Sequence, residues 1–96
     1  ARQLDAWLTV QRGHAIANGL PLAACNRVGV EDGNHFWGNS FVCGPQGEWL
    51  ARAGDEPGVL HATIDLDRSE QVRRIWPFLR DRRIDAYGDL LRRLRD

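Results

Sequence analysis

Apolar residues at the start of the chain recur at the spacing of a helix. Leu4, Trp7 and Leu8 fall on one helical face. Asn18-Gly19 is a typical signal for the C-terminal end of a helix, with a proline two residues further on. The pattern predicts a helix over about residues 3–18.

The stretch after this helix favours strands. Residues 20–28 are mostly apolar, which predicts a strand buried on both faces. Residues 41–43 and 49–53 flank Gly44-Pro45-Gln46-Gly47. Pro45 pre-sets the φ of the first central turn position, and a glycine at either end tolerates a crowded backbone. We therefore expect a β-hairpin.

Residues 59–66 show the alternation of a further strand. Their apolar members stand at every second position: Leu60, Ala62, Ile64 and Leu66. A turn over Asp55-Glu56-Pro57-Gly58 precedes them.

Two helices are predicted at the end of the chain. Asp67, with Glu70 three residues later, forms a capping-box pattern. The apolar positions that follow have helical spacing: Val72, Ile75, Trp76 and Leu79. Pro77 interrupts them, so this helix should stop or kink near Ile75. A last helix is predicted over about residues 83–94.

Composition is that of an ordinary globular domain, with 43% hydrophobic and 27% charged residues. Ninety-six residues without a repeat or linker suit one small domain. No apolar run approaches the roughly 20 residues of a membrane span, and no targeting signal is visible. We therefore expect a cytoplasmic chain without a membrane partner.

All thirteen basic residues are arginine, and none is lysine. The net charge of zero conceals an asymmetry, because residues 1–67 carry −4 and residues 68–96 carry +4. An arginine-rich tail is one form of nucleic-acid footprint. However, acidic residues are interleaved at spacings that suit intrahelical ion pairs: Asp81, Asp85 and Asp89. No nucleic-acid-binding motif accompanies them, so we expect a solvated face and no nucleic-acid partner.

Cys25 and Cys43 form no metal-binding pattern, because they are 18 residues apart without a nearby paired histidine. Each lies in an apolar stretch, where a free cysteine usually behaves as a small buried hydrophobe. A nucleophilic Cys25 would need an activating base or a helix N-terminus, and only Arg27 is near. A disulfide is possible on number alone, but nothing indicates an oxidising compartment. The histidines are spread over a helix, a loop and a strand, so no metal or acid–base cluster is expected: His14, His35 and His61.

Five short motifs, in order, resemble the carbon-nitrogen hydrolase (nitrilase) superfamily. The most informative runs from Phe36-Trp37-Gly38-Asn39-Ser40 through the hairpin turn to Glu48-Trp49-Leu50-Ala51. The others are Gln11 to Asn18, Pro21-Leu22 with Cys25-Asn26-Arg27-Val28-Gly29, Ile64-Asp65-Leu66, and Phe78 to Tyr87. Within the superfamily, the sequences of these motifs are most similar to those of the N-carbamoylputrescine amidases, enzymes of polyamine synthesis. Ile84 stands where the family tail usually has proline, and the loop over residues 30–35 is shorter than usual.

The resemblance implies an α/β fold, with residues 1–96 as the C-terminal portion of a nitrilase-type α-β-β-α sandwich. That portion would comprise a helix, about four strands and two C-terminal helices. Strands whose partners are missing leave exposed edges and an apolar face, so we expect the isolated chain to fold poorly.

The resemblance also implies hydrolysis of a linear amide or N-carbamoyl amine through a cysteine thioester, without a metal or organic cofactor. The family's glutamate base, lysine and cysteine nucleophile would precede this chain, which has no lysine. We therefore expect no catalytic residue in it. The alternatives are another amidase or nitrilase of the same superfamily and a non-catalytic interaction fragment.

Four residues are candidates for a substrate pocket. By the resemblance, the strand before Asn26 ends near the mouth of the active site. Asn26 either bonds substrate or satisfies backbone groups where the strand ends. His35, Phe36 and Trp37 are expected in a loop that walls the pocket, unless Phe36 and Trp37 belong to the core.

Three aromatic residues are candidates for a subunit interface. Trp76, Phe78 and Tyr87 flank Pro77, so they cannot share one continuous helical face. We expect them to pack against another subunit of a homo-oligomer.

Overall fold

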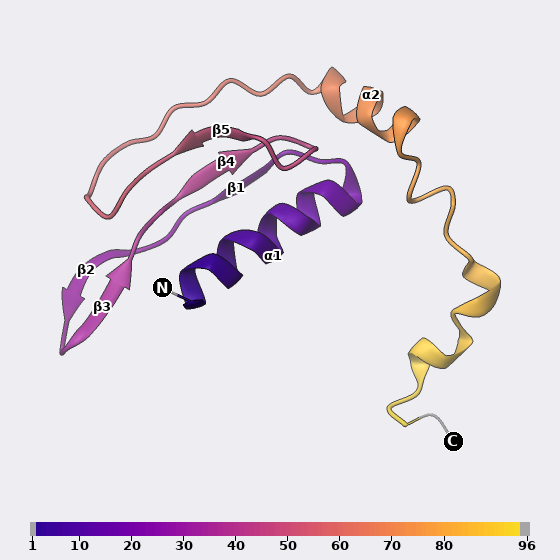
Figure 1. Ribbon diagram of the computed structural model, residues 1–96, viewed down its shortest axis with the longest axis horizontal. Helices are drawn as coiled ribbons and strands as arrows, with labels where there is room; N and C mark the ends of the chain where they lie inside the picture. Colours follow the sequence, from indigo (N-terminus) through magenta and orange to yellow (C-terminus); the bar gives the residue numbers. More distant parts are fainter. Residues whose placement is uncertain (1, 95–96) are drawn as a thin grey trace.

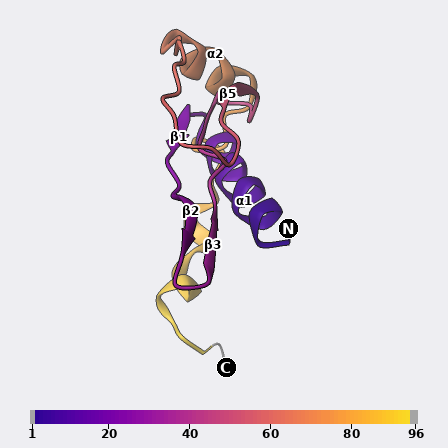
Figure 2. The ribbon, with the colours of Figure 1, turned by 90° about the vertical axis from the view of Figure 1, so that its left-hand side faces the viewer.

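The computed structural model describes residues 2–94. A helix, two small antiparallel sheets, a second helix and a tail follow one another along the chain. Figure 1 shows helix α1 (Arg2–Asn18) along the strands, and the tail curving away beyond helix α2 (Asp67–Ile75). The molecule measures 48 × 40 × 16 Å, and its thin direction is visible in Figure 2.

Helix α1 confirms the prediction over residues 3–18 and ends as the sequence indicates. Gly19 has a φ of 61°. Its N–H donates to the carbonyl oxygen of Ile16 at 3.3 Å, and the N–H of Leu20 donates to that of Ala15 at 3.1 Å. This pair of bonds is a Schellman motif, which satisfies carbonyl groups that the last helical turn leaves without partners.

The larger sheet has three antiparallel strands in the order β1-β4-β5. These are β1 (Leu22–Ala24), β4 (Phe41–Cys43) and β5 (Trp49–Arg52). The predicted β4–β5 hairpin is confirmed, and the N–H of Gly47 donates to the carbonyl oxygen of Gly44 at 2.9 Å across its turn.

A second hairpin, β2 (Val28–Glu31) and β3 (Asn34–Trp37), projects from the larger sheet (Figure 1). Asp32 and Gly33 both have positive φ, 52° and 79°, as a two-residue type I′ turn requires. The expectation that residues 35–37 lie in a loop is therefore wrong. The short turn returns the chain at once, so these residues pair with β2.

The core lies between α1 and the larger sheet. Phe41 is 1% exposed, and the other buried members of the cluster are Leu8, Ala15 and Cys43. The rings of Trp7 and Trp49 pack edge-on against Phe41, with centroids 5.5 and 5.4 Å away. Burying a phenylalanine side chain contributes about 1.5–3 kcal/mol.

Two predicted strands are wrong. Residues 20–28 do not form one buried strand, because β1 ends at Ala24 and the chain changes direction before β2. Residues 59–66 form no strand. Residues 57–65, which we call the strap, pass along the strands as an extended trace (Figure 1). Among residues 2–94, no backbone hydrogen bond joins the strap to a strand, so its alternating pattern has no partner to pair with.

Helix α2 ends at Ile75, as Pro77 predicts, but its start differs from the prediction. Leu66 occupies the N-cap position, and no side chain caps the helix. Instead, an Oδ1 of Asp65 accepts a hydrogen bond from the N–H of Asp67 at 3.1 Å. The capping box is therefore wrong.

The last predicted helix is also wrong. Residues 83–94 contain two 3₁₀ helices, Ile84–Ala86 and Gly88–Leu91. A glycine inside a helix costs about 1 kcal/mol, and Gly88 stands in the middle of the predicted span. Residues 78–94 are all exposed, so no tertiary packing stabilises a longer helix there.

Gly38 lets the chain pass from β3 into β4, and its substitution should destabilise the fold. Its φ is 63°, and a Cβ there would lie 2.6 Å from Cγ1 of Val28 and 2.9 Å from the carbonyl oxygen of Gly54. We expect Gly38→Ala to lower the free energy of unfolding by about 1–2 kcal/mol for the left-handed backbone alone. The control is Gly13→Ala, where a Cβ meets nothing within 4 Å and should stabilise α1 by about 0.5–1 kcal/mol. Denaturant titration measures both, and a Gly38→Ala variant as stable as wild type would contradict this account.

Candidate substrate pocket

Side chains from α1, from the β2–β3 hairpin and from the chain before it line a hollow of about 380 Å³. They are Gln3, Asn26, Asn34, His35, Phe36 and Trp37. All four residues that the sequence singles out for a pocket are in this set. The volume lies in the range of about 300–1,000 Å³ that is usual for small-molecule sites.

Gln3 and Asn34 were missed in the sequence. Asn34 begins β3, so identifying the Asp-Gly turn as a hairpin would have indicated it. Gln3 lies in the first turn of α1, far from the others along the chain. It reaches the hollow only through the packing of α1, which no local pattern reports.

Asn26 links the small hairpin to the larger sheet. Its Nδ2 donates to the carbonyl oxygen of Gly38 at 2.9 Å, and its Oδ1 accepts from the N–H of Arg27 at 2.9 Å. Its own N–H donates to Oγ of Ser40 at 2.8 Å. These are the bonds of a residue that satisfies backbone groups where a strand ends. They also fix the direction in which β2 and β3 leave the sheet.

Phe36 is held by a cation above its ring. The guanidinium of Arg27 lies 4.2 Å from the ring centroid and forms an ion pair with Glu31 on the same hairpin. Cation–π contacts of this kind contribute about 0.5–1 kcal/mol at exposed sites. Arg27 therefore covers one face of Phe36.

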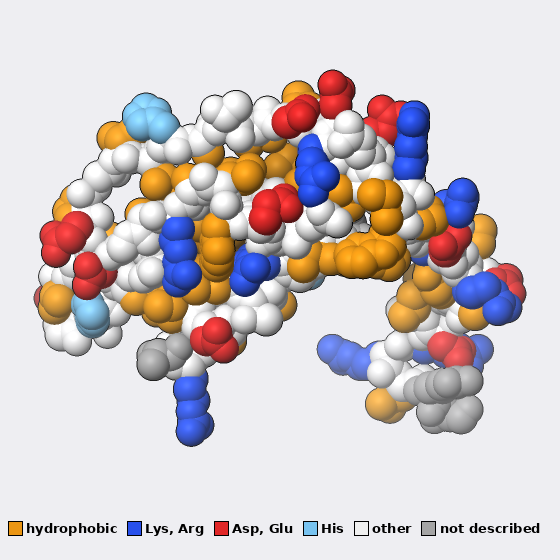
Figure 3. Space-filling view, turned by 45° about the horizontal axis from the view of Figure 1, so that its top comes forward, with side chains coloured by type: hydrophobic (Ala, Val, Ile, Leu, Met, Phe, Trp, Pro, Cys, Tyr) orange, Lys and Arg blue, Asp and Glu red, His pale blue; other side chains and the backbone are white. Residues whose placement is uncertain are grey.

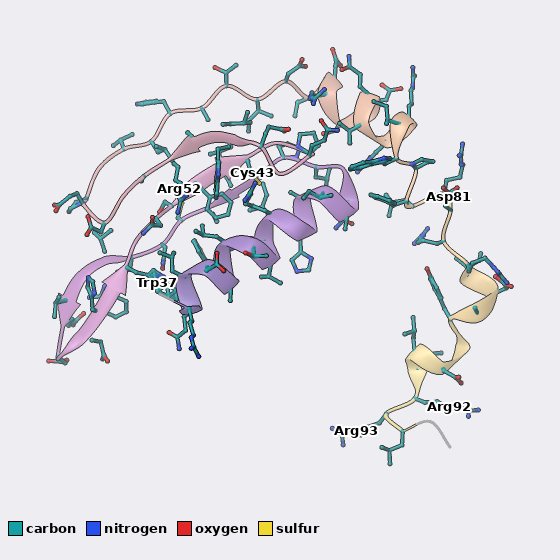
Figure 4. All side chains as sticks on the ribbon, in the orientation of Figure 1. Trp37, Cys43, Arg52, Asp81, Arg92 and Arg93 are labelled. Atoms are coloured by element: carbon teal, nitrogen blue, oxygen red, sulfur yellow. The ribbon has the colours of Figure 1, made fainter. Side chains whose placement is uncertain are left out.

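Trp37 packs towards the first turns of α1 (Figure 4). Its ring centroid lies 6.2 Å from that of Trp7, and the planes are tilted by 53°. Its Nε1–H is buried and has no hydrogen-bond partner among the described residues. An unpaired buried donor costs about 1–3 kcal/mol. The indole N–H of Trp37 therefore leaves an unmet hydrogen-bond donor in this wall of the hollow.

The three histidines stay apart in the fold. His14 lies on α1, His35 on β3 and His61 in the strap. Within residues 2–94, no three or more His, Cys, Asp or Glu side chains are gathered where they could hold a metal ion.

The two cysteines differ in environment. Cys43 in β4 is 0% exposed, and burial raises the pKa of its thiol above the ordinary value. Cys25 lies just beyond β1 and is exposed. The prediction that Cys25 is buried is therefore wrong, since the strand that would have buried it ends at Ala24.

Two of the candidate interface aromatics pack together outside the core. The rings of Trp76 and Phe78 lie 5.7 Å apart, and the residues are 48% and 47% exposed. Tyr87 is separate, between the two 3₁₀ helices, and is 40% exposed. Arg73 ties α2 to the end of α1, because its Nε and an Nη each donate to the carbonyl oxygen of Asn18 at 3.1 and 3.0 Å.

The tail carries local ion pairs at its surface. Arg83 contacts Asp85 at 2.7 Å and holds the pKa of that carboxyl below its usual value through the hydrogen bond. Arg80 lies 3.4 Å from Asp81. Arg92 and Arg93 lie near the end of the described chain (Figure 4), and Arg95 is outside the described residues.

Comparison with known proteins decides the family. Residues 2–74 match the family described as carbon-nitrogen hydrolase. The chain belongs to this family. It is 48% identical to N-carbamoylputrescine amidase of Solanum tuberosum over 91% of its length, and 36% identical to citrullinase of Francisella tularensis over 93%. It covers 32% and 33% of those proteins.

A solved carbon-nitrogen hydrolase from Helicobacter pylori G27 has the same fold in the matched region. The TM-score is 0.92 at 61% identity, over 98% of this chain and 35% of that one. The predicted α/β fold of nitrilase type is therefore confirmed. The chain spans about a third of the length of the relatives it matches. In residues 2–94, no helix has both the length and the hydropathy of a membrane span.

The contrast between the cysteines predicts selective labelling. Exposed Cys25 should react with a maleimide at the rate of a free thiol, whereas Cys43 should react only after unfolding. Burial raises the pKa of the Cys43 thiol in the folded state. Its protonated thiol therefore adds to the free energy of unfolding below the ordinary pKa of a thiol. That contribution is lost as the pH rises through the folded value. Mass spectrometry of timed labelling measures the maleimide reaction rates of the two cysteines, with Cys25→Ser as the control. Equal rates for both thiols in the native chain would contradict the structure.

Proposed function

We propose that this chain is the C-terminal part of an amidohydrolase, the parent enzyme, that acts on a linear N-carbamoyl amine. N-carbamoylputrescine is the preferred candidate. The observation that carries the proposal is the match to carbon-nitrogen hydrolases over residues 2–74, with the 48% identical relative named for that activity. The second candidate is citrulline, favoured by the relative named citrullinase.

The chemistry proposed for the parent enzyme is nucleophilic. A cysteine thiolate attacks the carbamoyl carbon, and one nitrogen takes up a proton and leaves as ammonia or amine. Water hydrolyses the resulting S-carbamoyl thioester, and the carbamic acid released loses carbon dioxide to give the second nitrogen product. One water and N-carbamoylputrescine give putrescine, carbon dioxide and ammonia. The glutamate, lysine and cysteine of this scheme would come from outside the present chain, which has no lysine to supply.

The proposed part of this chain is to wall the end of the substrate pocket. Phe36 and Trp37 offer apolar surface to an alkyl stem, and the hollow also contains three carboxamides and an imidazole. Those groups donate and accept hydrogen bonds with a polar terminus. Asn26 forms hydrogen bonds with Arg27, Gly38 and Ser40 of the chain itself, so we assign it the role of orienting the hairpin that carries His35 and Phe36.

The chain alone should be inactive. We expect no ammonia from N-carbamoylputrescine or citrulline with the purified 96-residue chain, and release from one of them with the parent enzyme. In the parent enzyme, Cys25→Ala should leave kcat within a few-fold, because the side chain is exposed and the sequence places only Arg27 near it, not an activating base. Since Cys25 is not packed in a core, the substitution should also cost little stability. Activity of the isolated chain that Cys25→Ser abolishes would overturn this assignment.

A second part of the proposal concerns assembly. We propose that Trp76, Phe78 and Tyr87 contact another subunit of a homo-oligomer, supported by their exposure outside the core. Aromatic anchors of this kind cost about 2 kcal/mol or more when truncated at the centre of an interface.

In the parent enzyme, Trp76→Ala with Phe78→Ala should therefore lower the oligomeric state or weaken it on dilution. The matched control replaces Arg92, Arg93 and Arg95 by Gln, which should do much less because surface charges such as the exposed Arg92 and Arg93 contribute little. Sedimentation velocity separates the two. An unchanged oligomer in the aromatic variant, or dissociation in the arginine variant, would refute the interface.

A further inference from the structure

Strand β3 has a free edge that borders the candidate pocket. The hollow of about 380 Å³ is lined by all four residues of β3, Asn34–Trp37, and, among the described residues, by none of β2. Within residues 2–94, β3 pairs with β2 alone. The edge of β3 that faces away from β2 therefore lies along the hollow.

The strand register shows which backbone groups point out of this edge. Glu31 and Asn34 close the two-residue turn, so they form a hydrogen-bonded pair. Hydrogen-bonded and non-hydrogen-bonded pairs then alternate along an antiparallel ladder. The next pair, Val30 with His35, is therefore not hydrogen-bonded. As a result, the N–H and the C=O of His35 both point away from β2, toward the hollow.

Two hydrogen bonds further along the hairpin agree with this alternation. The N–H of Gly38 donates to the carbonyl oxygen of Arg27 at 2.9 Å, as the next hydrogen-bonded pairs require. The carbonyl oxygen of Trp37 accepts from Nδ2 of Asn39 at 2.7 Å, outside the ladder. Among residues 2–94, no backbone hydrogen bond outside the β2–β3 ladder involves His35. Its outward donor and acceptor are thus available to a ligand.

A free N–H and a free C=O on one residue match the head group of an α-amino acid. In a hydrogen-bonded pair, each of two facing residues donates its N–H to the carbonyl of the other. An ammonium and a carboxylate on one carbon reproduce the facing residue. The ammonium donates to the carbonyl oxygen of His35, and a carboxylate oxygen accepts from its N–H. Both bonds are charge-assisted and therefore about twice as strong as neutral ones.

The two candidate substrates differ in this respect. Both have a ureido group and an alkyl stem that ends in an ammonium, and citrulline also has a carboxylate on the carbon that carries the ammonium. Figure 3 shows acidic side chains at the left-hand end of the molecule, which the hairpin helps to form, and Asp32 is exposed in the hairpin turn. Negative charge favours an ammonium and opposes a carboxylate. A carboxylate at this end therefore requires a directed donor.

We infer that the backbone N–H of His35 is the donor that allows a carboxylate at the far end of the substrate. The pocket then accepts ureides that end in an amino acid as well as those that end in an ammonium. Gln3 lines the same hollow from α1, and its carboxamide has a donor for the second carboxylate oxygen. The inference rests on the proposed function, which supplies the two substrates.

Replacement of His35 by proline tests this inference, because proline removes the N–H and keeps the carbonyl. Proline is tolerated on an edge strand where the N–H faces outward. The residue before a proline must be extended, as Asn34 is in β3. His35→Ala is the matched control, since it removes the imidazole and keeps the N–H. The probes are ornithine and putrescine, the amine products of the two hydrolyses, which bind without turnover.

Titration calorimetry on the parent enzyme gives the dissociation constants of both amines. We expect His35→Pro to lower the affinity for ornithine relative to putrescine by about tenfold or more, as the loss of a hydrogen bond to a charged group does. His35→Ala should leave this ratio near its wild-type value. In the wild-type enzyme, ornithine should slow amide exchange of the peptide that carries residues 34–37, and putrescine should not.

An unchanged ratio in His35→Pro, an equal fall of the ratio in His35→Ala, or amide exchange that ornithine does not slow would overturn the inference. Dissociation of the parent oligomer by His35→Pro in sedimentation would also overturn it, because the edge would then pair with another subunit. Hydrolysis of the two ureides is measured separately. A parent enzyme that hydrolyses neither, but binds ornithine through the N–H of His35, would reject the proposed function and keep the inference.

Discussion

The contact between helix α1 and strand β4 organises this chain, because most of its few fully buried side chains meet there. Phe41 lies between the helix and the sheet with Trp7 and Trp49 edge-on to its ring. Arg12 on α1 adds a second tie, since its Nε donates to the carbonyl oxygen of Gly47 at 2.8 Å and its guanidinium lies 4.4 Å from the Trp49 ring centroid. A change that moved α1 would therefore also move the β4–β5 turn and the candidate pocket, which lies beside the first helical turn of α1.

The candidate pocket is connected to this core indirectly, through the contact between Trp37 and Trp7. Trp37 reaches back to Trp7, while Asn26, Gly38 and Ser40 clamp the point where the small hairpin leaves the larger sheet. The hairpin carries His35 and Phe36 on a short type I′ turn, so their placement follows from a rigid junction and not from a long loop. This explains how a two-residue turn presents aromatic and polar side chains to one hollow.

Sequence patterns of a few residues correctly predicted the turns and helix ends, which depend on local backbone geometry. The C-cap at Asn18-Gly19, the Pro45 turn and the stop before Pro77 all involve backbone geometry within a few residues, and each is confirmed. Predictions were less reliable for elements that need a pairing strand or a packing surface elsewhere in the fold. The alternation over residues 59–66 indicates a strand, but pairing needs a neighbouring strand. The helix predicted over residues 83–94 has nothing to pack against, because these residues are all exposed. The four pocket candidates came from a family resemblance, and Gln3 could be found only from the packing of α1.

The central claim is that this chain packs one face of its larger sheet against α1, while the strap stays exposed and forms no backbone hydrogen bond to a strand among residues 2–94. Amide hydrogen exchange of the isolated chain, resolved by peptide, measures this directly. The account predicts the slowest exchange in α1 and β4, and exchange close to that of an unfolded peptide in the strap and in residues 78–94. Protection of the strap equal to that of β4 in the monomeric chain would contradict it, because the strap would then be hydrogen-bonded to the sheet or packed against it.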